Sequence, residues 1–317
     1  MKIWINAPFS VENIELIKKS AVGAEVCSGA VPVHGAEIIV GQLSPDCDLT
    51  MLKLLQSTNA GVEKLLDGSV PENVTIANVT GAFGEVISEY ILAGILALSR
   101  RIFDYRKNQE IHLWKPVLGD FLLFGKTALI FGCGDIGSNT AVKLKAFGMK
   151  TVGIRRKPAP AKGFDKIYGS EEADNLLSDA DVIICCLPHT PQTEKMLGTK
   201  QFQLLKPGSI FVNVGRGSVI DTEALTKALL SGNIFGAVLD VFEQEPLPEN
   251  SPLWDMENVL ITPHISGPSF GHFPEVERKI AEICAENISR YISEKPLINV
   301  INRSIGYAER GENSCRT

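Results

Sequence analysis

Residues 127–137, TALIFGCGDIG, decide the fold expected for this chain. The run TALIF predicts a buried strand, and an apolar helix is expected directly after the loop, over Ile136–Phe147. Between them the glycines follow the spacing G-x-G-x-x-G. Glycine permits a tight turn and a close approach of the backbone, and the N–H groups that open a helix attract an anion. The stretch therefore predicts a strand–loop–helix unit that seats the pyrophosphate of a dinucleotide.

Short apolar runs alternate with helical patterns on both sides of this unit. The predicted strands are Lys2–Ile5, Glu37–Val40, Leu52–Gln56, Val74–Ala77, Thr127–Phe131, Thr151–Ile154, Val182–Leu187, Ile210–Val214, Phe235–Leu239 and Val259–Thr262. The predicted helices are Val11–Ser20, Glu85–Asn108, Ile136–Phe147, Thr222–Leu230 and Pro274–Ser293. Strands separated by helices indicate parallel sheets covered on both faces. We expect an α/β protein with a Rossmann-type, doubly wound cofactor domain and a smaller, flavodoxin-like α/β substrate domain.

The length of 317 residues favours two domains. We place the substrate domain at residues 1–93 and 275–317, and the dinucleotide-binding domain at residues 94–274. The last helix would then return to the first domain. Asp221 is a suitable N-cap for the helix that follows it, and Gly232 a suitable stop. The polar tail ERGENSCRT, residues 309–317, is expected to be disordered.

Composition argues against several classes of protein. The formal net charge of −6 leaves no broad basic surface for nucleic acid or an anionic membrane. No apolar run reaches the roughly 18 residues that span a bilayer. The seven cysteines are odd in number and match no metal-site spacing, which favours small buried side chains in a reducing compartment. We expect a cytoplasmic protein with no metal, nucleic-acid or membrane partner.

The end of the strand after the glycine loop bears on the choice of dinucleotide. It is followed by Arg155, Arg156 and Lys157, with no acid. An NAD site usually carries Asp or Glu there, about 20 residues past the glycines. A carboxylate would repel a 2′-phosphate, whereas arginine binds one through charge-assisted hydrogen bonds. NADP is therefore favoured as the cofactor; an NAD site beside a solvated basic turn is the alternative.

Further motifs resemble the D-isomer-specific 2-hydroxyacid dehydrogenases over nearly the whole length. The segments that carry the resemblance are STNAGVEKL (57–65), VISEY (86–90), FGCGDIG (131–137), CLPHTPQTEKMLG (186–198), LLKPGSIFVNVGRGSVID (204–221), LDVFEQEPLPENSPLW (239–254) and ITPHISG (261–267). The resemblance implies that Arg216 holds the substrate carboxylate and carbonyl. It also implies that His264 is the general acid/base and that Glu245 hydrogen-bonds its imidazole.

These residue types suit the reduction of a 2-oxo acid. Such an acid presents a carboxylate beside a ketone, which a guanidinium fork matches. Hydride arriving at C2 leaves charge on oxygen, so a proton donor is needed there, and histidine can give that proton and take it back. The nicotinamide carries the hydride, and the protein positions and polarises the substrate.

The glycine loop and the two arginines after the next strand supply the first predicted cofactor contacts, and the resemblance implies the remaining ones along the adenosine, phosphate and nicotinamide portions. They are Gly132, Gly134, Asp135, Ile136, Gly137, Arg155, Arg156, Leu187, Pro188, Thr193, Val214, Gly215, Arg216, Asp240, His264, Ser266 and Gly267. Asp240 would bind the carboxamide. His189 lies in the loop that lines the cofactor and is a weaker candidate.

For the substrate, the resemblance implies backbone N–H groups at Asn59, Ala60 and Gly61, together with Arg216 and His264. A turn residue without substrate contact is the alternative for Asn59. The expected reaction is NAD(P)H-dependent reduction of small 2-oxo acids to D-2-hydroxy acids.

Two features bear on partners. Trp114-Lys115-Pro116 resembles a stretch of glyoxylate/hydroxypyruvate reductases in which a tryptophan reaches the partner subunit's active site, which implies a homodimer. An anchor at the domain junction is the alternative for Trp114. A dinucleotide-sensing interaction protein of the corepressor type, which shares the fold and the Arg-Glu-His set, is the alternative function.

Overall fold

The computed structural model describes residues 1–308, and the tail for which disorder was expected lies outside them. The chain divides into two compact units. Unit 1 comprises residues 1–82 and the segment from Pro268 onward, and unit 2 comprises residues 83–267. The boundaries proposed from the sequence differ: a division after residue 93 would cut a helix, Gly84–Ser99, that belongs entirely to unit 2.

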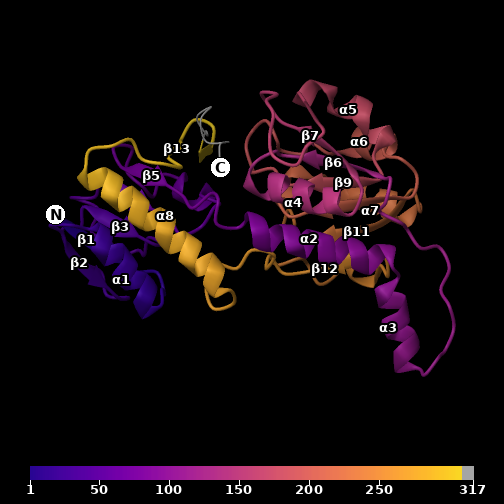
Figure 1. The fold of residues 1–317 in the computed structure, drawn as a ribbon, viewed down its shortest axis with the longest axis horizontal. Coiled ribbons are helices and arrows are strands. Elements are labelled where there is room, and N and C mark those ends of the chain that lie inside the picture. The colour runs from indigo at the N-terminus through magenta and orange to yellow at the C-terminus, as the bar shows by residue number, and fades with distance from the viewer. Residues whose placement is uncertain (309–317) are drawn as a thin grey trace. The chain divides into compact units, whose positions relative to one another are not determined.

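Unit 2 is built on a parallel sheet with the strand order β12-β11-β10-β9-β6-β7-β8 (Figure 1). Its strands are β6 (Thr127–Phe131), β7 (Lys150–Ile154), β8 (Lys166–Tyr168), β9 (Val182–Cys185), β10 (Ser209–Asn213), β11 (Ile234–Leu239) and β12 (Val259–Ile261). The order reverses at β6, which pairs with β7 on one side and β9 on the other. This is the Rossmann order extended by one strand, and it confirms the predicted fold class.

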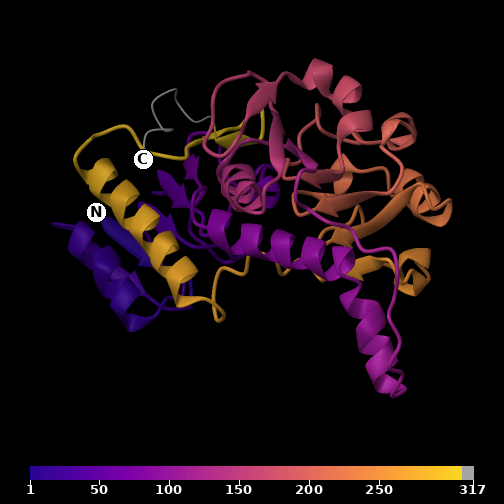
Figure 2. The ribbon, with the colours of Figure 1, turned by 45° about the vertical axis from the view of Figure 1, so that its right-hand side comes forward.

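Helices cover both faces of this sheet. On one face α2 (Gly84–Ser99) and α4 (Asp135–Ala146) run side by side, and Gly94 of α2 sits directly on Val238 of β11 (Figures 1 and 2). On the other face lie α5 (Ala173–Leu176), α6 (Thr199–Leu204) and α7 (Thr222–Leu230). Their apolar side chains form one core with Phe131, Phe211 and Leu239.

Unit 1 is a second doubly wound sheet, with the order β2-β1-β3-β4-β5. Its elements are β1 (Lys2–Ile5), α1 (Val11–Ser20), β2 (Glu25–Ser28), β3 (Ile38–Val40), β4 (Leu54–Gln56), β5 (Thr75–Ala77), α8 (Pro274–Ile292), β13 (Ile301–Asn302) and β14 (Tyr307–Ala308). The parallel order is that of flavodoxin-like folds, as predicted. Helix α8 returns to this unit and packs beside α1, where Glu277 accepts hydrogen bonds of 2.7 Å from Ser10 N and Asn13 Nδ2.

The single helix predicted over Glu85–Asn108 was wrong. The chain breaks after Ser99 and resumes as α3 (Ile102–Glu110), which projects from the body of unit 2 (Figure 1). Arg101 adopts a left-handed conformation, with φ of 57°, and its side chain pairs with Asp104 and lies over the ring of Phe235. These contacts stabilise a left-handed conformation that an α-helix cannot contain, so the helix ends here. The apolar pattern continues through the break and therefore does not reveal it.

Candidate active site

The predicted site residues of unit 2 share one place in the fold. Each follows the carboxyl end of a strand: the glycine loop follows β6, Arg155 follows β7, Leu187 follows β9, Arg216 follows β10, and the segments with Asp240 and His264 follow β11 and β12. In doubly wound sheets this edge binds ligands, at the point where the strand order reverses. The topology therefore brings the predicted cofactor contacts and catalytic residues to one edge of unit 2.

The glycine loop fits a dinucleotide. Helix α4 begins at Asp135 after Gly134, which supplies no side-chain cap to the first N–H groups of the helix. A Cβ atom added at Gly134 would meet nothing within 4 Å, which leaves open space for a pyrophosphate. The carboxylate of Asp135 instead accepts a hydrogen bond of 2.7 Å from Gly84 N at the start of α2. The negative charge of Asp135 is therefore bound by the start of α2.

Arg155 lies at the end of β7 and near the glycine loop. Its backbone N–H donates to Tyr168 O at 3.1 Å, and its guanidinium makes a long contact of 3.4 Å with Ala159 O. Burial raises the pKa of Cys133, within the glycine loop, to about 12, and the nearby charge of Arg155 acts in the opposite direction. The Cys133 thiol is therefore neutral, and Arg155 supplies positive charge at this end of the site.

Arg216 is held by a tightly packed turn. Asn213, which ends β10, accepts from Gly215 N at 3.1 Å and donates to Arg216 O at 3.2 Å. A Cβ at Gly215 would lie 2.4 Å from Leu187 O, and one at Gly217 would overlap the backbone of Phe242. Both glycines are needed because Arg216 sits between the loops that follow β9 and β11. In this structure its Nη1 donates to Gly215 O at 2.8 Å.

His264 and Glu245 form a direct pair. Nδ1 of His264 lies 2.9 Å from Oε2 of Glu245, while Oε1 accepts from Phe242 N at 3.0 Å. The carboxylate can only accept when ionised, so Nδ1 carries the proton and Nε2 is left for a ligand. The two side chains are 47% and 37% exposed, so a small molecule can reach them. The predicted pairing of these two residues is thus present in the geometry.

Asp240 has a role that sequence reasoning missed. It is fully buried, and its carboxylate accepts hydrogen bonds from Thr262 Oγ1 at 2.6 Å, Ile265 N at 2.8 Å and Ser266 N at 3.0 Å. Its backbone oxygen accepts from His264 N at 2.8 Å. His264 has φ of 55°, a conformation that costs a non-glycine residue about 1–3 kcal/mol. Asp240 therefore anchors the segment that carries His264. The feature of the sequence that could have indicated this anchoring role is an acidic residue directly after a buried strand.

The loop after β9 is ordered by its own side chains. Thr193 Oγ1 donates to Pro188 O at 2.7 Å and accepts from Thr190 N at 2.9 Å. His189 Nδ1 lies 2.8 Å from Ser218 Oγ, in the 3-10 turn directly after Arg216. The loop predicted to line the adenosine portion is thereby tied to the turn that holds Arg216.

The predicted substrate loop belongs to unit 1. Asn59 N donates to Ser57 Oγ at 3.1 Å, its side chain accepts from Ser269 Oγ at 3.2 Å, and Asn78 Nδ2 donates to Ala60 O at 2.6 Å. The backbone N–H of Asn59 is thus engaged within the loop. The Ala60 carbonyl accepts a hydrogen bond from the Asn78 side chain.

Among residues 1–308, no group of three or more His, Cys, Asp or Glu side chains is arranged to hold a metal ion. None of the helices in this part of the chain has both the length and the apolar character to cross a membrane.

Comparison with known proteins gives consistent matches. Residues 92–266 match the family described as D-isomer specific 2-hydroxyacid dehydrogenase, NAD binding domain. A glyoxylate reductase from Aeropyrum pernix is 33% identical over 275 residues, 82% of this chain and 80% of that protein. A crystal structure of a D-isomer specific 2-hydroxyacid dehydrogenase family protein from Aeromonas salmonicida is 35% identical, with a TM-score of 0.83 over 95% of this chain and 99% of that one. An NADPH-dependent glyoxylate/hydroxypyruvate reductase from Sinorhizobium meliloti, solved with NADP and sulfate, is 28% identical, with a TM-score of 0.81 over 96% and 99%.

Proposed function

The chain belongs to the D-isomer-specific 2-hydroxyacid dehydrogenase family, and we propose that it reduces small 2-oxo acids to D-2-hydroxy acids with NADPH. The observation that carries this proposal is the His264–Glu245 pair, 2.9 Å apart, on the same sheet edge as the glycine loop. A proton donor and a dinucleotide loop on one edge are what ketone reduction requires. No relative named above is a corepressor.

Arg216, His264 and Glu245 take the catalytic roles. When bound, the reduced nicotinamide supplies the hydride that adds to C2 of the substrate. Arg216 binds the carboxylate and polarises the ketone, and Nε2 of protonated His264 gives its proton to the ketone oxygen as the C2–H bond forms. The products are the 2-hydroxy acid, the oxidised dinucleotide and neutral His264, which regains a proton from solvent. Glu245 keeps the imidazole oriented through Nδ1.

Preference for NADPH rests on the end of β7. Arg155 and Arg156 follow that strand where an NAD site would carry an acid. Two of the similar solved structures, at 27% and 28% identity, are described as complexes with NADPH or NADP. The guanidinium of Arg155, already close to the glycine loop, is the proposed partner of the 2′-phosphate. We propose that Ala60 and Gly61 present backbone N–H groups to the substrate carboxylate, while the backbone N–H of Asn59, expected from the resemblance to do the same, donates to Ser57 Oγ and orders the loop.

The test is a panel of glyoxylate, hydroxypyruvate and phenylpyruvate, each assayed with NADPH and with NADH. We expect oxidation of the reduced cofactor with at least one acid, and a higher kcat/KM with NADPH. If no acid supports oxidation of either cofactor while both still bind, the enzymatic function is refuted and the cofactor-sensing alternative gains support.

We also propose a homodimer formed through the arm, defined as α3 and residues 111–124. Trp114 and Leu118 are 101% and 87% exposed, and Leu122 and Phe124 are exposed as well. Several large apolar side chains exposed along one segment are typical of a protein interaction surface. We propose that a second copy of the chain binds to this surface of the arm.

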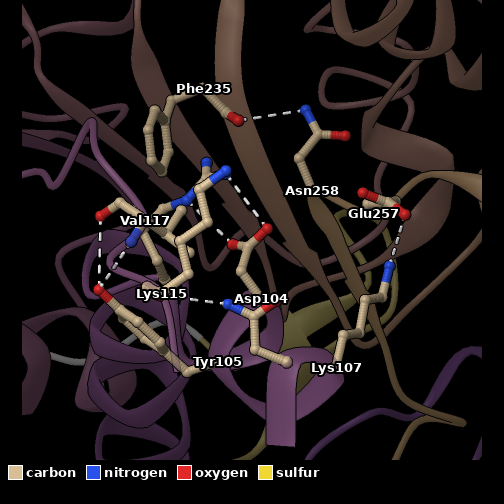
Figure 3. Close-up of polar contacts among 10 residues, drawn as sticks. Asp104, Tyr105, Lys107, Lys115, Val117, Phe235, Glu257 and Asn258 are labelled. Carbon is tan, nitrogen blue, oxygen red and sulfur yellow. Dashed lines mark hydrogen bonds and ion pairs between the residues drawn. The ribbon is translucent and has the colours of Figure 1, made fainter. Parts of the chain in front are cut away.

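Polar contacts tie the arm to the rest of unit 2 and join its helix to its extended segment. Figure 3 shows Lys107 reaching Glu257, at 2.6 Å, and the Tyr105 hydroxyl beside the backbone of Val117, whose N–H donates to it at 3.1 Å. A preformed surface loses less conformational entropy on association. Light scattering should give a dimer mass for wild type and for Val31→Glu, whose parent side chain is 80% exposed in unit 1, and a monomer mass for Leu118→Glu. A monomeric wild type would refute the dimer.

A further inference from the structure

The segment from Thr262 to Ser266 wraps around the carboxyl group and the backbone oxygen of Asp240. Three consecutive backbone N–H groups, those of His264, Ile265 and Ser266, donate to Asp240 at 2.8–3.0 Å. Since Asp240 is fully buried, these hydrogen bonds are made without competition from water. His264 N is held by the backbone of Asp240, and the two residues that follow His264 are held by the Asp240 carboxylate, so the path of the chain through His264 depends on the orientation of that side chain.

The orientation of that side chain depends in turn on Thr262. Its hydroxyl lies 2.6 Å from Asp240 Oδ1 and 2.6 Å from the hydroxyl of Tyr90. An ionised carboxylate only accepts, so the single Thr262 proton points to Asp240. Tyr90 must then be the donor to Thr262. The direction of the chain is thus Tyr90 to Thr262 to Asp240.

Tyr90 links this chain to a helix. It lies on α2, which packs against α4 and on β11, and it is partly buried. Burial raises the pKa of Tyr90 to about 12, and the charge of Asp240 adds to the effect, so the phenol keeps the proton that it donates. The hydrogen-bond chain therefore ties the loop that carries His264 to a packed helix of the same unit.

We propose that Tyr90 and Thr262 are positioning residues of the reaction, which act through Asp240 to hold His264 in its left-handed conformation. This proposal rests on the acid/base role of His264 in the proposed function. Neither residue needs to touch substrate. Their effect should fall mainly on the turnover step, because a misplaced proton donor raises the barrier to proton transfer.

The test compares Thr262→Val with Thr262→Ser. Valine keeps the shape but removes the hydroxyl, which leaves both Asp240 Oδ1 and the Tyr90 hydroxyl without their partner. We expect a fall in kcat of about 10–100-fold for Thr262→Val, larger than any change in the Kd for NADPH. Serine restores the hydroxyl and should recover most of the loss. Tyr90→Phe should lower kcat less, because it leaves the Thr262–Asp240 hydrogen bond in place.

Tyr291→Phe is the matched control. Its hydroxyl also donates to a carboxylate, Glu37, at 2.8 Å, but within unit 1, so kcat should not change. Equal kcat values for Thr262→Val, Thr262→Ser and wild type would overturn the proposal, as would equal losses in both variants. If Thr262→Val does not fold, the kcat of Tyr90→Phe is compared with that of Tyr291→Phe. A lower kcat in Tyr90→Phe supports the proposal, and equal values overturn it.

A second readout separates this proposal from the proposed function. The imidazole NMR signals of His264, assigned with His264→Asn, should shift in Thr262→Val and return in Thr262→Ser. These signals report on position even if wild-type protein reduces no 2-oxo acid. Unshifted signals would contradict the positioning role, whereas inactivity of the wild type would contradict the proposed function alone.

Discussion

Two loops on the same sheet edge are held in very different ways. The segment after β12, with His264, is anchored by a buried carboxylate through hydrogen bonds of 2.6–3.0 Å. The turn after β7, with Arg155, is solvent-exposed beyond that residue, and the Arg155 guanidinium donates a long hydrogen bond of 3.4 Å to Ala159 O. The first loop bears a residue proposed for proton transfer, and the second bears residues proposed to select the cofactor.

The difference follows from the two tasks. Proton transfer requires a donor within hydrogen-bond reach of the reacting atom, so small displacements are costly. A long, exposed arginine side chain can bring its guanidinium to a phosphate through changes of its own rotamers, so this task does not require a fixed backbone. A buried anchor suits the first task, and an exposed, adjustable side chain suits the second.

The largest effect should come from removing the anchored group. His264→Ala is expected to lower kcat by about 10²–10⁴-fold, because the proton donor is lost, while the Kd for NADPH changes little. Steady-state kinetics and fluorescence titration measure the two quantities. His34→Ala, which removes an exposed imidazole of unit 1, is the control. Near-normal turnover in His264→Ala would refute the acid/base role.

A smaller effect is expected at the adjustable loop. Arg155→Asp should lower the ratio of kcat/KM for NADPH over NADH by about 10–100-fold, since a charge-assisted hydrogen bond is replaced by repulsion. Lys150→Asp makes the same charge change at the opposite end of β7 and should leave the ratio unaltered. If the ratio is unchanged in Arg155→Asp, Arg155 does not contribute to cofactor selection.

The smallest effect should come from the opposite edge of the sheet, where Asp181 precedes β9. Burial opposes ionisation of Asp181, but Lys206, Thr127 N and Lys126 outweigh it and place its pKa below the ordinary 3.8. A lowered folded-state pKa stabilises the fold above the ordinary value, and this contribution is lost as the pH falls through the lowered one. Asp181→Asn should therefore lower Tm at neutral pH by about 2–4 °C, for a cost of about 1 kcal/mol, without changing kcat.

The control for this variant is Asp179→Asn, which changes an exposed neighbour. Thermal melts across the acid range should show the deficit of Asp181→Asn shrinking below the ordinary pKa. A deficit that stays constant with pH, or one that is matched by Asp179→Asn, would contradict the role of the buried carboxylate.

Much of the fold could be predicted because its strands are continuous apolar runs. Thr127–Phe131 and Thr222–Leu230 have the predicted bounds, and Asp221 caps α7 as expected by accepting from Ala224 N. The edge strands β2 and β8 were missed, since they are short and contain polar residues. An edge strand has a neighbour on one side only and can contain polar residues, so apolar periodicity does not predict it well.

The site was predictable where motifs specify backbone geometry. The glycines around Arg216 and in the phosphate loop mark close backbone approaches, which a linear sequence reveals. The break at Arg101 and the anchoring by Asp240 depend on partners distant in the chain, Phe235 for the first and Thr262 with Tyr90 for the second. Such pairings arise only when the sheet has folded, so local pattern does not contain them.

The most direct test is the configuration of the product. Hydroxypyruvate and NADPH should be incubated with the enzyme and the glycerate resolved by chiral chromatography. The account predicts D-glycerate in an amount equal to the NADPH oxidised, and almost none with His264→Ala. Formation of L-glycerate, or of D-glycerate at the same rate without His264, would contradict it.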